Sequence, residues 1–215
     1  MLVTRSGLVS LLIPVALAIP ACRRDISVPD SPPATAESPT NAPATERVVG
    51  PLSATDAEAL ATMNDRIKGY MAVHQKLERT LPAVPKDATP EQIDQNQRAL
   101  EKLVRENRAT AKAGDIFTPT AQPVIKRLLA TVFGGPDGKQ LKASIMDENP
   151  VGIKLAVNAR YPDIVPLSTV PPEVLQTLPK LPEELLYRFV GNRLIILDAH
   201  AHVVADFIED ALPNY

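Results

Sequence analysis

From residue 52 onward, the first half of the chain alternates apolar and polar positions with the period of an α-helix. Between residues 55 and 81, seven side chains recur every three or four positions: Leu60, Met63, Ile67, Tyr70, His74, Leu77 and Leu81. This spacing places them on one face of a helix. Thr55 to Glu58 has the form of a capping box and Pro82 interrupts the pattern, so we predict a helix between these points.

A second helix is predicted after Thr89. Thr89, Pro90 and Gln92 combine a capping hydroxyl, a proline at the first helical position and a capping-box glutamine. The apolar stripe that follows consists of Ile93, Leu100, Leu103, Val104 and Ala111, and Gly114 is the predicted stop. Because the loop between the two helices is short, we expect them to form an antiparallel hairpin.

Two shorter helices are predicted next. Thr118 and Pro119 repeat the cap-and-proline signal ahead of an apolar set made of Val124, Leu128, Leu129, Val132 and Phe133. Residues 134–138 predict a turn, and a brief helix follows it with Leu141, Ile145 and Met146. The glycine-rich turn lacks a preceding strand and the GxxxxGK[ST] spacing, which excludes a phosphate-binding loop.

The apolar period changes to two residues in the second half. Val151, Ile153, Leu155 and Val157 alternate with smaller or polar side chains, which predicts a half-buried strand. Prolines interrupt residues 161–182 and leave room for a helical turn around residues 174–178. A strand is predicted over residues 186–190 and a second over residues 193–197, and a type II′ turn at residues 191–192 joins them. One more strand is predicted over residues 203–208.

This succession predicts an α+β fold: an N-terminal helical hairpin and short helices, then a small antiparallel sheet with a C-terminal β-hairpin. Residues 52–215 have the length of a single domain, mainly helical over 52–149 and mainly strand and proline-rich loop over 150–215.

The start of the chain has the pattern of an export signal. Arg5 precedes an apolar run from Leu8 to Ala21, which is shorter than a membrane span and holds two prolines. Cys22, the only cysteine in the chain, follows directly. Residues 19–22 resemble the lipobox of bacterial lipoproteins. The resemblance implies a signal peptide over residues 1–21 and lipidation of Cys22, which would anchor the chain to a membrane of the periplasm or cell envelope.

An ordinary signal peptide and a soluble secreted protein form the alternative, because Pro20 departs from the lipobox pattern. Residues 22–51 are rich in Pro, Ala, Ser and Thr and hold few large apolar side chains, so we expect a disordered tether. A single cysteine excludes an intramolecular disulfide.

The C-terminal region contains PPEVL, LPEELLYRFVGNRLIILD and VVADFI between residues 171 and 213. It resembles the C-terminal region of uncharacterised bacterial envelope proteins. The resemblance implies export and a single domain, and it implies no activity or site residues.

Composition and motifs narrow the classes of function. The chain has 23 basic and 25 acidic residues, no basic stripe with interleaved aromatics and no Trp, so nucleic acid is not an expected partner. No GxSxG, HExxH or SxxK motif occurs. We therefore expect a non-enzymatic envelope protein without a cofactor, attached to the membrane through its lipid and binding or scaffolding an unknown envelope protein.

Asp198, His200 and His202 form the sharpest local motif. In an extended segment all three point to one side, where two imidazoles and a carboxylate can bind Zn²⁺ with a water in the open position. Further oxygen donors follow closely: Asp206, Glu209 and Asp210. This motif gives the alternative function, a small metal-binding protein or metallohydrolase. The competing interpretation is that Asp198 caps a turn and the histidines lie on an exposed strand edge.

Two further interpretations involve histidines, and neither assigns a function to the chain. Residues 194–202 are similar to the first-strand His-x-His motif of amidohydrolases, but that family needs a barrel of about 250 residues. Only 13 residues follow His202, so this class is excluded. His74 lies on the first apolar stripe and is interpreted as a hydrogen-bonded core or groove residue without a functional role.

Overall fold

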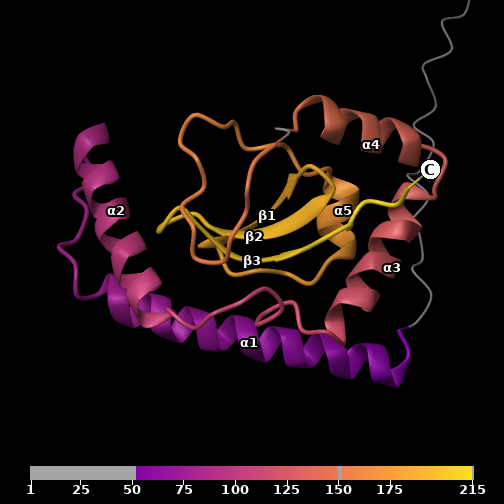
Figure 1. The fold of residues 1–215 in the computed structure, drawn as a ribbon, viewed down its shortest axis with the longest axis horizontal. Helices are drawn as coiled ribbons and strands as arrows, with labels where there is room; N and C mark the ends of the chain where they lie inside the picture. Colours follow the sequence, from indigo (N-terminus) through magenta and orange to yellow (C-terminus); the bar gives the residue numbers. More distant parts are fainter. Residues whose placement is uncertain (1–51, 150–151, 215) are drawn as a thin grey trace, which may run out of the picture. The chain divides into compact units, whose positions relative to one another are not determined.

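The structure, a computed structural model, describes residues 52–149 and 152–214, and the structural statements below concern these residues. Helices precede strands along the chain: α1 (Ala54–Glu78), α2 (Pro90–Asn107), α3 (Ala121–Phe133), α4 (Gly138–Asp147), α5 (Pro172–Thr177), β1 (Leu185–Val190), β2 (Arg193–Asp198) and β3 (Val203–Ile208) (Figure 1). This order confirms the predicted α+β class. The predicted signal peptide, the tether and Cys22 lie outside the described residues.

The two long helices begin with side-chain caps. Ser53, rather than Thr55, caps α1, because its Oγ accepts a hydrogen bond from the Asp56 N–H at 3.1 Å. The capping box of α2 is confirmed. The Thr89 N–H donates to Gln92 Oε1 at 2.8 Å, and Thr89 Oγ1 accepts from the Gln92 N–H at 3.3 Å.

Several predicted helix limits need correction. The first helix ends at Glu78, before Leu81, and the second ends at Asn107, well before Gly114. Ile93 was predicted to face the core, but half of its surface is exposed. The helix predicted from Thr118 begins at Ala121. Hydrogen-bonded turns follow the first two helices: the Thr80 N–H donates to the Leu77 carbonyl and the Ala111 N–H donates to the Arg108 carbonyl, both at 2.9 Å.

The three strands form an antiparallel sheet in the order β1-β2-β3. Gly191 in the β1–β2 turn has φ 59°, as the predicted type II′ turn requires. A β-bulge interrupts the second pairing: Ile196 pairs with Asp206 and Leu197 pairs with Val204, so Ala205 has no partner on β2.

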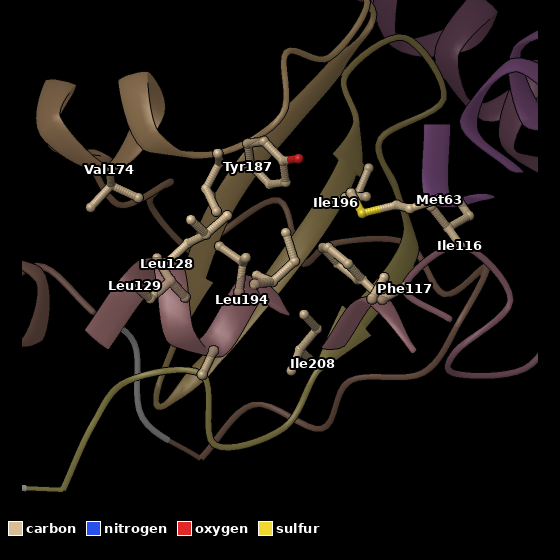
Figure 2. Packing of buried hydrophobic residues seen from close by; sticks show 14 of the residues in the cluster. Met63, Ile116, Phe117, Leu128, Leu129, Val174, Tyr187, Leu194, Ile196 and Ile208 are labelled. Carbon is tan, nitrogen blue, oxygen red and sulfur yellow. The ribbon is translucent and has the colours of Figure 1, made fainter. Parts of the chain in front are cut away.

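Both faces of the sheet are covered. Side chains of α1, α3 and α5 pack on one face against Tyr187, Leu194 and Ile196 (Figure 2). On the other face, Tyr161 packs with Val190, Ile195, Leu197 and Val204. A small third cluster joins the end of α1 and α2 to the turn after β2, through Leu77, Leu100, Val104, Ala201 and Val203. This last cluster positions the site described below.

The strand predicted from Val151 is wrong for the part that the structure describes, because residues 152–158 form no strand. Ile153 and Leu155 are partly buried against the second sheet face, and Asn158 adopts φ 62°. The alternation therefore reflects one-sided burial of a loop and not pairing in the sheet. Among the described residues, no helix is long and apolar enough to cross a membrane.

Candidate metal centre

Three side chains on α1 make a row that faces the turn between β2 and β3. Tyr70, His74 and Glu78 are spaced by four residues, which places them on one face of the helix. Tyr70 and His74 are buried, whereas the Glu78 side chain is 38% exposed. The row therefore runs from the core of the domain to its surface.

Asp198, the last residue of β2, forms hydrogen bonds with two side chains of this row, Tyr70 and His74. Its Oδ2 accepts a hydrogen bond from the Tyr70 hydroxyl at 2.6 Å and lies 2.6 Å from His74 Nδ1. Its Oδ1 accepts from the Ala201 N–H at 2.8 Å. Because an ionised carboxylate only accepts hydrogen bonds, His74 Nδ1 carries the proton and its Nε2 faces away from Asp198.

The second nitrogen of His74, Nε2, lies on the Glu78 side of the ring. Nε2 is buried and has no hydrogen-bond partner among the described residues, and Glu78 Oε2 lies 3.5 Å away. The other Glu78 oxygen, Oε1, lies 2.8 Å from His200 Nδ1, and the two imidazole rings are 5.7 Å apart.

The donor atoms of His74, Glu78 and His200 lie within 4.8 Å of one another. Ligand atoms about 2.1 Å from a tetrahedral ion are about 3.4 Å apart, so small side-chain movements bring all three into bonding distance. The donor set is that of a zinc site, with two imidazoles and one carboxylate.

Burial and the Asp198 carboxylate together shift the pKa values of His74 and Tyr70. Burial alone lowers the pKa of His74, but its hydrogen bond to Asp198 and the charges of nearby carboxylates outweigh burial and raise it. Burial, together with the charge of Asp198 and the hydrogen bond to it, raises the pKa of Tyr70 well above its usual value. Tyr70 is therefore a hydrogen-bond donor to Asp198 throughout the physiological range.

The structure does not bring together the residues of the predicted Asp198, His200 and His202 site. The extended conformation on which that prediction rested is wrong, because residues 199–202 form a turn and His202 adopts φ 54°. Asp198 caps this turn through Ala201, as the competing interpretation expected. Of the three, only His200 joins His74 and Glu78 as a potential ligand. Asp198 instead accepts a hydrogen bond from His74.

His202 lies on the other side of the turn. Its ring packs edge-on against Tyr161, with the ring centres 5.9 Å apart, and its Nε2 is 3.7 Å from Asp163. Burial and the neighbouring Arg160 charge lower the pKa of His202. It belongs to the contact between the turn and the loop after Arg160.

Two of the further oxygen donors predicted from the sequence, Asp206 and Glu209, bind other groups. Asp206 is buried and accepts hydrogen bonds from the N–H groups of Gly114, Ile116 and Phe117. Glu209 pairs with Arg193 at 2.7 Å. Asp206 therefore has a structural function, since it fixes the loop between α2 and α3.

Sequence reasoning missed His74 and Glu78. His74 contacts Asp198 across 124 positions of sequence, and no local pattern reports such a contact. The available signal was a histidine on an apolar stripe with an acidic residue four positions later, a spacing that places two potential ligands on one helix face.

A groove of about 670 Å³ opens next to this cluster. Glu78 and His200 line one end of it. The remaining wall comes from Arg79, from residues 81–84, from α2 and from Ala199. The candidate site is thus reachable from solvent on the side opposite His74.

Comparisons of the chain with protein-family models, with curated proteins and with solved structures found no match. The resemblance of residues 171–213 to envelope proteins therefore stays a prediction. The function has to be argued from the geometry of the site.

Proposed function

We propose that this domain binds a divalent transition metal, with Zn²⁺ as the ion best suited to its donors, through His74, Glu78 and His200. The buried Nε2 of His74 carries this proposal. A buried polar atom without a partner costs free energy, and a ligand that accepts its lone pair removes that cost. Nε2 faces a carboxylate and a second imidazole, which together complete a three-residue donor set.

The environment of His74 supports the same proposal. Histidines that bind metals usually donate their other N–H to a carboxylate, which fixes the tautomer and orients the ring. Asp198 accepts this hydrogen bond, and Tyr70 and Ala201 in turn hold Asp198. These contacts around His74 support its assignment as a metal ligand.

We further propose that the domain acts at the cell envelope, attached to a membrane through lipidated Cys22 and the tether over residues 22–51. The basic start, the apolar run and the sole cysteine support this location. Of the functions considered from the sequence, the metal-binding one is favoured over scaffolding by the convergence of His74, Glu78 and His200. Soluble secretion remains the alternative if the signal peptide is an ordinary one.

Zinc titration of the full-length chain by calorimetry tests the metal site. We expect one Zn²⁺ per chain, with Mg²⁺ as a control that binds far more weakly because it prefers oxygen ligands. His200→Asn is expected to weaken zinc binding at least about tenfold, because it removes a ligand. The matched variant His202→Asn should bind zinc as the wild type does, and asparagine tolerates the positive φ at that position. Equal losses in both variants, or no zinc binding by the wild type, would contradict the proposal.

A further inference from the structure

The groove beside the metal centre has its own chemistry. Large apolar side chains are exposed along its wall: Val84 is 45% exposed and Ile93 is 50% exposed, with Leu81 beside them. A volume of about 670 Å³ lies in the range of pockets that bind small organic molecules. The wall therefore offers an apolar surface to a molecule of that size.

Two amide side chains of the wall hold the groove together. Asn96 donates through Nδ2 to the Pro82 carbonyl at 3.0 Å, and Gln97 donates through Nε2 to the Ala199 carbonyl at 3.2 Å. These bonds fix the segment after α1 and the turn after β2 against α2. The amides thus shape the groove, and its apolar side chains are left to contact a bound molecule.

The open side of the proposed metal centre faces this groove. The His74 side chain is fully buried behind the centre, whereas the side chains of Glu78 and His200 are 38% and 49% exposed. An ion held by these three residues has protein on the His74 side and the groove on the other. The fourth position of a tetrahedral ion is then open to the groove, where a water or a bound molecule can occupy it.

The charge of the centre selects the kind of fourth ligand. A divalent ion bound by two neutral imidazoles and the Glu78 carboxylate keeps one unbalanced positive charge in its coordination sphere. An anionic oxygen donor balances it, and carboxylates are common ligands of Zn²⁺. The ligand that fits both ends of the groove has a carboxylate head and an apolar body.

We propose that the groove binds a small organic acid, with its carboxylate on the metal and its apolar chain along Leu81, Val84 and Ile93. This inference rests on the proposed metal centre and deepens it by naming the class of ligand. The carboxylate head and the apolar body of the ligand contribute separately to its affinity. Each can therefore be removed from the probe in turn.

Calorimetry on the full-length chain with bound zinc tests the proposal with three probes: hexanoate, acetate and hexanamide. We expect hexanoate to bind about tenfold more tightly than acetate, because its additional CH₂ groups leave water. Hexanamide should bind at least tenfold more weakly than hexanoate, because it lacks the anionic head. The same loss is expected for hexanoate when zinc is removed with a chelator.

A pair of isoleucine variants controls for the position of the chain. Ile93→Ser should reduce the preference for hexanoate over acetate several-fold and leave zinc affinity unchanged. Ile164→Ser removes an isoleucine that is 94% exposed and outside the groove lining, and it should change neither quantity.

The outcomes separate the two proposals. Zinc binding that depends on His200, combined with equal affinity for hexanoate and acetate, would overturn the organic-acid inference and leave the metal centre intact. Hexanoate binding that persists without zinc would also overturn it. A wild-type chain that binds no zinc would overturn both.

Discussion

At the scale of single residues, the candidate centre depends on how Asp198 holds His74. The carboxylate accepts the hydrogen bond of Nδ1–H, so Nε2, next to Glu78, is the nitrogen left to bind a metal. The same hydrogen bond joins the end of β2 to the C-terminal part of α1. One contact thus fixes the fold locally and sets the tautomer of the proposed ligand.

Asp198→Asn tests this relation between tautomer and metal binding. An asparagine amide donates to Nδ1, so the imidazole proton moves to Nε2 and blocks the metal-binding lone pair. We expect zinc affinity to fall about 10–100-fold. Tyr70→Phe is the matched control: it removes another hydrogen bond to Asp198 but keeps the tautomer of His74, so a few-fold change at most is expected. An unchanged zinc affinity in Asp198→Asn would contradict the assigned tautomer.

His74 and His202 should titrate on opposite sides of the usual histidine pKa of about 6.5 in the metal-free chain. The pKa of His74 is raised, so the stability that it contributes is present below pH 6.5 and is lost as the pH rises through the raised value. The pKa of His202 is lowered, so its contribution is present above pH 6.5 and is lost as the pH falls through the lowered value. NMR titration of the two imidazoles in chelator-treated protein measures both directions, and identical pKa values would contradict the described environments.

At the scale of elements, the loop between α2 and α3 depends on Asp206. The bulge at Ala205 precedes this aspartate, whose Oδ2 accepts from the Ile116 and Phe117 N–H groups at 2.7 and 2.8 Å. Phe117 lies in the main core, so the bonds secure both a loop and a large buried side chain.

Asp206→Ala is expected to lower the free energy of unfolding by about 3 kcal/mol, because it leaves buried N–H groups without acceptors. Chemical denaturation followed by circular dichroism measures this loss. Asp147→Ala, at the exposed end of α4, is the control and should change stability by less than about 0.5 kcal/mol. A loss of similar size in both variants would show that Asp206 has no special function in the loop.

Elements with a strong local signal could be predicted from the sequence. The capping box of α2 and the Gly191 turn between β1 and β2 are set by nearby residues, and the structure confirms both. The strand predicted at residues 152–158 is wrong, because this segment is a loop. The partial burial of Ile153 and Leu155 gives the loop the alternating pattern of a strand, although residues 152–158 pair with no strand. The centre combines α1 with the turn after β2, and such long-range packing leaves no periodic pattern in a sequence.

At the scale of the whole molecule, the proposed function has two separable parts, an attachment at Cys22 and a binding site in the folded domain. Cys22 lies outside the described residues, and its assignment comes from residues 19–22 and the apolar run before them. The metal centre rests entirely on residues between Tyr70 and His200. Either part can therefore fail without the other.

Cys22→Ser should move the protein from the membrane fraction to the soluble fraction of an expressing bacterium, because it removes the thiol that carries the lipid. Fractionation followed by immunoblotting measures the distribution, and mass spectrometry of the mature N-terminus measures the lipid. Zinc affinity of the released protein should equal that of the wild type. Unchanged membrane association of the variant would contradict the lipid anchor.

The central claim is the metal centre itself, and anomalous diffraction at the zinc edge tests it most directly. Crystals of the full-length chain grown with Zn²⁺ should show one anomalous peak about 2.0–2.2 Å from His74 Nε2, a Glu78 oxygen and a His200 nitrogen. Asp198 should remain hydrogen-bonded to His74 Nδ1 without contacting the metal. A peak bound by His202, or no peak beside a still unpartnered His74 Nε2, would contradict the account.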